Sequence, residues 1–198
     1  MRARVAAARV AAIVALVATI RVAVARAAPP ATIAASRDVV DSLPRDDDAG
    51  ARRRLRCNAC AAACDALVRD LARERARNGG TLTRARADAT MEATCARAGE
   101  ELGLTMRDGR VTETFAGDDG NARARGRWIT TYAREACARL IDGEHDDALM
   151  AFGRRDDGGV RTEARETLCH ARTATCESAA AARAANELGA WDRRDREL

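Results

Sequence analysis

Seven cysteines constrain what this chain can fold into more than any other feature of its sequence. Six of them form a symmetric arrangement in which a close pair at each end flanks two single cysteines. The full set is Cys57, Cys60, Cys64, Cys95, Cys137, Cys169 and Cys176. Large apolar residues are few, and aromatic residues make up only 3% of the chain. Because burial of so little apolar surface gives a thin core, disulfide crosslinks are expected to stabilise the fold.

Spacing alone does not choose among the 15 pairings that six cysteines allow. If the first and last helices lie side by side, each cysteine of the first close pair reaches one of the last. The two single cysteines then join the two middle helices. Closing a loop of roughly a hundred residues stabilises a fold by up to about 4 to 5 kcal/mol in the chain-entropy model. This arrangement predicts the disulfides Cys57–Cys176, Cys60–Cys169 and Cys95–Cys137.

The remaining cysteine, Cys64, lies one helical turn after Cys60, on the same apolar face. Free cysteine is among the most buried residue types and behaves as a small apolar side chain. Cys64 is therefore predicted to be a buried free thiol. The alternative is that Cys64 forms mixed disulfides with other proteins.

Two other uses of the paired cysteines stay open at this point. The run Cys57-Asn58-Ala59-Cys60 has the spacing of a thioredoxin-like redox pair, although no strand-rich pattern precedes it. A tetrahedral zinc site is the other reading, but the second half has a C-x6-C spacing that is looser than usual. Because a secreted protein oxidises such thiols, disulfides are favoured and no metal ligand is predicted. The zinc reading would use Cys57, Cys60, Cys169, His170 and Cys176.

Residues 1–27 have the anatomy of a cleavable signal peptide. A cationic start precedes an apolar run from Val10 to Ile20, and small residues alternate up to Ala27. Arg21 interrupts the apolar run, which is too short to span a membrane. An organelle transit peptide is the rival interpretation, since this segment is rich in Arg and has no acid. Serine is nearly absent, however, and the cysteines favour an oxidising compartment, so the secretory pathway is predicted.

The charge and residue usage exclude several classes of function. The net charge of +4 comes from five arginines in residues 1–27, and the rest carries 29 basic and 30 acidic residues. A nucleic-acid partner is therefore not expected. Lysine is absent, so a Schiff-base mechanism is excluded. A serine triad would have to use Ser178 with His145 or His170, but no nucleophile-elbow glycines surround Ser178. No catalytic residue and no cofactor are predicted.

The remainder divides into a disordered linker over residues 28–54, a disulfide-stapled all-α domain over residues 55–189, and a tail over residues 190–198. Prolines and charge runs mark the linker, and order is expected to begin near Leu55. A short β-hairpin is expected within residues 104–115, around Asp108-Gly109. Apolar residues at helical spacing predict helices over residues 60–71, 83–102, 127–141 and 144–152, and from 162 through 185.

The order of these motifs resembles the canopy family, whose members have saposin-like folds with an insertion and reside in the endoplasmic reticulum. The similarity covers about Leu55 to Ser178. It is carried by Leu55-Arg56-Cys57-Asn58-Ala59-Cys60, by the single Cys95 and Cys137, and by Leu168-Cys169 with Cys176. The resemblance implies a saposin-like helical fold with the disulfide pairing given above. The short Cys60–Cys95 interval and the extra Cys64 depart from the family pattern.

The resemblance also implies a non-enzymatic folding or maturation factor of the endoplasmic reticulum. Its partners would be client proteins of the secretory pathway and other lumenal chaperones. The last four residues, Asp195-Arg196-Glu197-Leu198, end in Glu-Leu as retrieval signals do, without the order of K-D-E-L, and are interpreted as a degenerate retrieval signal. The predicted location is the lumen of the endoplasmic reticulum, and secretion is the alternative. Two alternatives are a saposin-like lipid-binding protein and a thiol-disulfide exchange protein.

Overall fold

The computed structural model describes residues 32–34, 48–107, 110–117 and 123–187. The predicted signal peptide, residues 28–31 and 35–47 of the predicted linker, and the tail lie outside this part. Helices contain most of the described residues, as predicted. They are α3 (Ala49–Arg77), α4 (Arg84–Glu101), α5 (Arg127–Leu140), α6 (Asp146–Gly153), α7 (Val160–Arg165), the π-helical segment η1 (Glu166–Arg172) and α8 (Ala179–Ala184).

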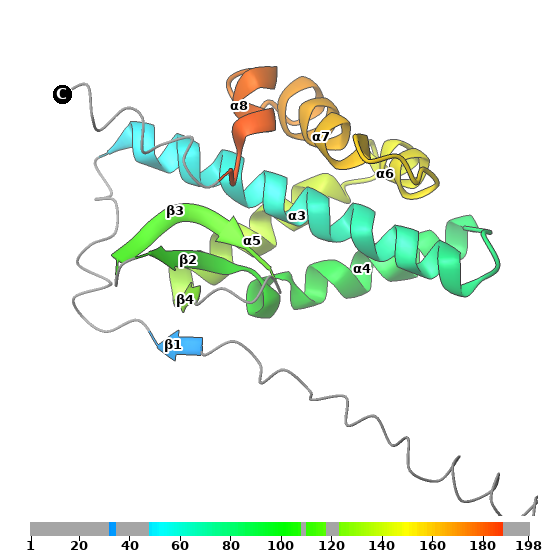
Figure 1. The fold of residues 1–198 in the computed structure, drawn as a ribbon, viewed down its shortest axis with the longest axis horizontal. Coiled ribbons are helices and arrows are strands. Elements are labelled where there is room, and N and C mark those ends of the chain that lie inside the picture. The colour runs from blue at the N-terminus through cyan, green and yellow to red at the C-terminus, as the bar shows by residue number, and fades with distance from the viewer. Residues whose placement is uncertain (1–31, 35–47, 108–109, 118–122, 188–198) are drawn as a thin grey trace, which may run out of the picture.

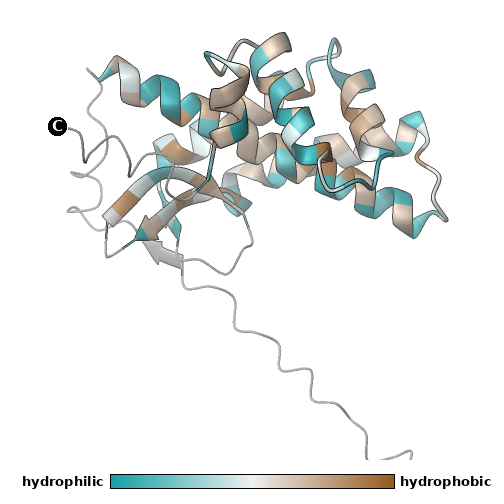
Figure 2. Ribbon diagram, turned by 45° about the horizontal axis from the view of Figure 1, so that its top comes forward, coloured by the Kyte–Doolittle hydropathy of each residue, from teal (hydrophilic) through white to brown (hydrophobic). Residues whose placement is uncertain are grey.

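Helix α3 is the central element of the molecule and is 29 residues long. Helix α4 and the sheet lie on one side of it, and α6, α7 and α8 lie on the other (Figure 1). Alanine, cysteine and leucine fill its buried faces, so neighbouring helices approach it closely. Figure 2 shows hydrophilic and hydrophobic residues alternating along the helices. No helix among the described residues is both long and apolar enough to cross a membrane.

Helix α3 begins at Ala49, six residues before the predicted start of order at Leu55. The Asp48 side chain caps this end by accepting a hydrogen bond from the backbone N–H of Ala51 at 2.8 Å. This bond lowers the pKa of Asp48 below its ordinary value. Alanine and arginine are strong helix formers, so the Ala-Arg run after the cap extends the helix back from the apolar stripe.

A small sheet lies against one side of the helices, with the strand order β1-β4-β2-β3. The predicted hairpin is present, since β2 and β3 are antiparallel and pair Leu104 with Phe115. Strand β4 pairs antiparallel with β2, and β1 pairs parallel with β4. The predicted helical domain with a hairpin is therefore present, and the short strands β4 and β1, which were not predicted, extend the hairpin into a sheet. The strands are β1 (Thr32–Ala34), β2 (Gly103–Arg107), β3 (Arg110–Ala116) and β4 (Arg123–Arg125).

The outer edge of β3 is closed by two asparagines rather than by another strand. The Asn58 side chain donates from Nδ2 to the carbonyl oxygen of Glu113 at 2.9 Å. The Asn186 side chain accepts from the N–H of Phe115 at 2.8 Å, and its own Nδ2 donates to the carbonyl of Asn58 at 2.7 Å. Asn186 has a positive φ of 62°, which asparagine tolerates. These bonds tie α3, the sheet edge and the segment after α8 together.

The predicted helix from residue 162 onward is divided into three pieces. Helix α7 passes directly into η1, a wider turn that carries Cys169. Residues 173–178 then leave the helical path, and Ala174 has a φ of 49°. The Ser178 side chain caps α8 by accepting from the N–H of Ala181 at 3.0 Å.

Candidate functional site

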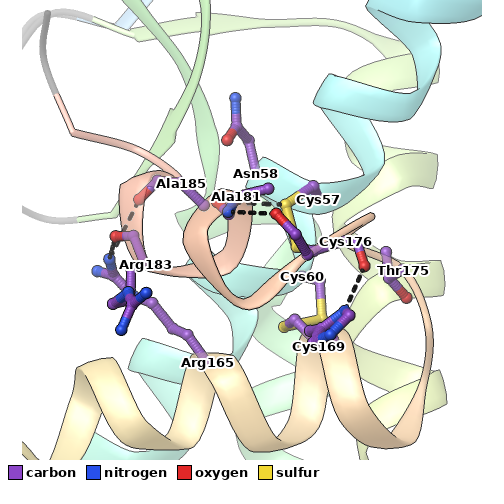
Figure 3. Close-up of a disulfide and its surroundings, with 12 residues drawn as sticks. Cys57, Asn58, Cys60, Arg165, Cys169, Thr175, Cys176, Ala181, Arg183 and Ala185 are labelled. Carbon is purple, nitrogen blue, oxygen red and sulfur yellow. Dashed lines mark hydrogen bonds between the residues drawn. A yellow bond between two sulfur atoms is a disulfide. The ribbon is translucent and has the colours of Figure 1, made fainter. Parts of the chain in front are cut away.

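The three disulfides of the structure are the pairs named from the sequence. Two of them join the first half of α3 to the carboxy-terminal segment (Figure 3). The third joins α4 to α5. The Cα–Cα distances are 4.7 Å for Cys57–Cys176, 5.9 Å for Cys60–Cys169 and 5.4 Å for Cys95–Cys137.

This pairing gives no support to redox chemistry at the C-x2-C run. Cys57 and Cys60 bond to different partners, whereas a redox pair of this spacing bonds within itself. Both sulfurs are also buried. The same bonds occupy all four sulfurs of the alternative zinc site. In the described part of the chain, no group of three or more histidine, cysteine or acidic side chains is placed to hold a metal ion.

Cys64 is the free cysteine of the described chain and is completely buried in the core. Burial raises the pKa of its thiol far above the ordinary value, and the charge of Asp65 raises it further. Thiol chemistry requires the thiolate, so Cys64 is an inert core residue. The predicted retrieval signal, Asp195 to Leu198, lies outside the described residues.

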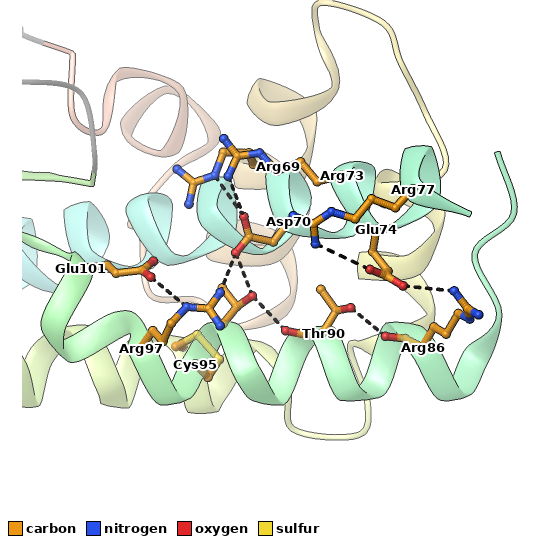
Figure 4. A network of polar contacts seen from close by, with 12 residues as sticks. Arg69, Asp70, Arg73, Glu74, Arg77, Arg86, Thr90, Cys95, Arg97 and Glu101 are labelled. Atoms are coloured by element: carbon orange, nitrogen blue, oxygen red, sulfur yellow. Dashed lines mark hydrogen bonds and ion pairs between the residues drawn. A yellow bond between two sulfur atoms is a disulfide. The ribbon is translucent and has the colours of Figure 1, made fainter. Parts of the chain in front are cut away.

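A polar groove between α3 and α4 has a volume of about 600 Å³, and we call it the arginine groove. Its charged side chains come from both helices (Figure 4). Small side chains on α4, chiefly Ala89 and Ala93, leave the space open. The groove is lined by Arg69, Asp70, Arg73, Glu74, Arg77, Arg86, Ala89, Thr90, Ala93, Arg97 and Glu101.

Asp70 lies on the floor of the groove near one end and holds the arginines there in place. Its side chain is 12% exposed and forms ion pairs with Arg69 at 3.2 Å, Arg73 at 3.5 Å and Arg97 at 3.2 Å. The hydroxyl of Thr94 donates a further hydrogen bond to it at 3.0 Å. One carboxylate is therefore shared by three guanidinium groups. Arg97 also donates from Nε to Glu101 at 2.8 Å, and each guanidinium has further N–H donors beyond these bonds.

Glu74 has the same function at the other end of the groove. It is 22% exposed and pairs with Arg86 of α4 at 3.4 Å and Arg77 of α3 at 3.9 Å. Asn78 also donates to its Oε1 atom at 2.6 Å. Asp70 and Glu74 thus lie on the floor, whereas the five arginines are 34% to 76% exposed and form the rims. The third acid, Glu101, is 38% exposed and pairs with Arg97 at the end of the α4 rim. Five arginines against three acids leave an excess of two positive charges.

This groove was not predicted from the sequence. Arginines four residues apart on a helix are typical of any solvated face, and the sequence gives no sign that a second helix carries matching arginines opposite them. The arginine triplet 52–54, which is the visible basic run, lies elsewhere on α3.

A second hollow, of about 350 Å³, lies between α3, the β2–β3 hairpin and α7. Arg165 on its wall pairs with Asp65, with Nε at 2.8 Å from Oδ1. It also donates to the carbonyl of Ala185 at 3.1 Å (Figure 3). Burial acts to lower the pKa of Arg165, but the bond to Asp65 and its charge raise that pKa above the ordinary value. This pair holds α7 and the end of α8 to α3, which is a structural function.

Comparisons of the chain with protein-family models, with curated proteins and with solved structures give no match. The functional proposal therefore depends on the residues and their arrangement.

Proposed function

We propose that this protein is a non-enzymatic folding or maturation factor of the endoplasmic reticulum lumen that binds secreted or membrane client proteins. The observation that carries the proposal is the nature of its polar surface. The described chain offers an organised arginine groove, whereas all seven cysteines are crosslinked or inert. Such a surface suits recognition of a partner rather than covalent chemistry.

Three disulfides are typical of an oxidising secretory or extracellular compartment. The amino-terminal segment has signal-peptide anatomy. The cysteine order also resembles that of the canopy family. These observations support the lumen as the place of action.

The alternative functions receive less support from the described residues. Lipid binding in a saposin-like protein needs an apolar interior that opens, but both hollows here are lined mainly by charged and polar side chains. Thiol-disulfide exchange needs an accessible thiolate, and the described chain holds its one free thiol in the core.

Crosslinking in intact cells tests the proposal. The full chain carrying an affinity tag ahead of its tail is crosslinked in its host, purified and analysed by mass spectrometry. Recovery of secretory-pathway glycoproteins or lumenal chaperones would support the proposal. A protein found quantitatively outside the cell, with no partner crosslinked to it, would contradict it.

A further inference from the structure

The arginine groove combines three properties of a built anion-binding surface. Its arginines come from two helices, they are held in place by acids beneath them, and they outnumber those acids. An arginine fixed by a floor carboxylate loses little side-chain entropy when it binds another anion. The planar guanidinium also presents paired N–H donors, which match the two oxygens of a carboxylate.

The spacing along α3 indicates the shape of the ligand. Arg69, Arg73 and Arg77 recur every four residues. Four residues of α-helix rise about 6 Å. Alternate side chains of an extended peptide lie about 6.5 to 7 Å apart on one side. Carboxylates at alternate positions of an extended segment therefore match successive arginines of this rim.

The opposite rim fits the same ligand. Arg86 and Arg97 on α4 are eleven residues apart, which corresponds to about 16 Å along the helix. This span accommodates about five residues of extended chain. Between these two arginines α4 presents Ala89, Thr90 and Ala93. These small side chains leave room for a peptide backbone.

The acidic floor favours a peptide over a more densely charged anion. Asp70 and Glu74 lie beneath the rims with 12% and 22% of their side chains exposed. A sulfated glycan or a phosphate brings several negative charges together and would meet these carboxylates. Single carboxylates spaced along a chain bind the rims and avoid the floor.

We propose that the arginine groove binds an extended acidic segment of a client polypeptide, with carboxylates at alternate positions meeting successive arginines of α3. This inference rests on the proposed function, because the segment belongs to a client.

The test is fluorescence anisotropy with a labelled peptide that alternates Glu and Ser, against a matched peptide with Gln in place of Glu. The protein is the full chain, produced through a secretory pathway so that its disulfides form. The Glu peptide is expected to bind, and its affinity should fall as salt rises. The Gln peptide should not bind.

A variant with three rim arginines replaced tests whether the peptide binds the groove or is attracted by the overall charge of the protein. The triple variant Arg73→Gln, Arg77→Gln, Arg86→Gln should weaken Glu-peptide binding about tenfold or more. A control makes the same charge change at exposed arginines elsewhere, and should weaken binding less than about twofold because salt screens distant charges. The control is Arg53→Gln, Arg139→Gln, Arg183→Gln.

Four results would overturn the inference. The Glu peptide fails to bind, the two triple variants lose affinity equally, or the Gln peptide binds as well. In the fourth, a heparin fragment binds the groove and displaces the Glu peptide, which would assign a sulfated glycan instead. Circular dichroism and non-reducing disulfide mapping establish that both variants are folded.

Client crosslinking keeps this inference distinct from the proposed function. If the wild-type chain and the groove variant capture the same clients, the groove inference fails and the function stands. If the wild-type chain captures no client, the function fails whatever the peptide assay shows. Loss of clients in the groove variant alone supports both.

Discussion

Asn58 connects parts of the molecule that are far apart in the sequence. It lies between the two cysteines of the first close pair and is completely buried. Its side chain bonds to the carbonyl of Glu113 on β3 and accepts from the N–H of Asn186 at 3.3 Å. Buried polar groups are retained when they are fully bonded. The middle of the C-x2-C run therefore serves the packing of the sheet against α3.

The first prediction is that Asn58→Ala destabilises the fold by about 2 to 4 kcal/mol. The substitution leaves the carbonyl of Glu113 and the N–H of Asn186 without their partner inside the protein. Urea unfolding measures the change. Asn78→Ala is the control, because the Asn78 side chain, at the end of the same helix, bonds only to Glu74, and its loss should cost less than about 1 kcal/mol. Equal losses in the two variants would contradict this account.

The second prediction concerns the reactivity of Cys64. Because burial raises the pKa of its thiol, its thiolate is scarce at neutral and mildly alkaline pH. Iodoacetamide should leave the native protein unmodified and should add one group to Cys64 once denaturant unfolds the chain. Intact mass and peptide mapping give the readout. Rapid alkylation of the native protein would show that the thiol is accessible.

At the scale of the elements, helix contacts depend on glycines that allow close approach. A methyl group at Gly153 of α6 would lie 2.6 Å from the Cβ of Leu71 on α3. One at Gly99 of α4 would lie 2.7 Å from the Cγ2 of Thr130 on α5. Both distances are too short for carbon atoms, so larger residues would push the helices apart.

The third prediction is that Gly153→Ala destabilises the protein by about 1 to 3 kcal/mol, because the added methyl group overpacks the contact with Leu71. The control is Gly158→Ala in the loop before α7, where an added methyl group meets no atom within 4 Å. That substitution should be neutral or slightly stabilising. Thermal or urea unfolding compares the two. A neutral Gly153→Ala would show that α6 shifts at little cost.

The helices were largely predictable because apolar residues recur at helical spacing, and the cysteines on those stripes indicated which helices pair. The sheet beyond the hairpin was not predictable. Strand β4 is only Arg123 to Arg125, too short and too polar to show an alternating pattern. The groove was hidden for a different reason, since Arg73 and Arg97 come together only when α3 and α4 pack. A single helix pattern contains no information about its neighbour's charges.

At the scale of the whole molecule, α3 divides into two functional halves. Its first half carries Cys57, Cys60 and Asn58, which fix it to the sheet edge and the carboxy-terminal segment. Its second half carries the arginine groove and is held by packing and ion pairs. Covalent fixation of one half leaves the other as an exposed, charged surface, and the proposed client binding uses that surface.

The last prediction follows from the nesting of two crosslinks. Cys57–Cys176 and Cys60–Cys169 close loops of 119 and 109 residues. While one of them is intact, the other closes only a small loop of the unfolded chain. That loop consists of residues 57–60 and 169–176, which lie between the two bonds. Removing either alone should cost about 3 kcal/mol in the chain-entropy model. Removing both should cost about 7 kcal/mol, more than the sum of the two single losses, because the last restraint on the long loop is then lost.

The third crosslink, Cys95–Cys137, is not nested in this way, and its removal opens its full loop of 42 residues. It should cost about 4 kcal/mol, more than either nested bond alone despite its shorter separation in sequence. Urea unfolding of the paired Cys→Ala variants measures all four losses. If each disulfide instead contributes according to its own sequence separation, removal of Cys57–Cys176 would cause the largest loss of stability. That result would contradict the account of two nested bonds that restrain one loop. The observed order of the losses therefore reports whether the two nested disulfides stabilise the fold by restraining the same long loop of the unfolded chain.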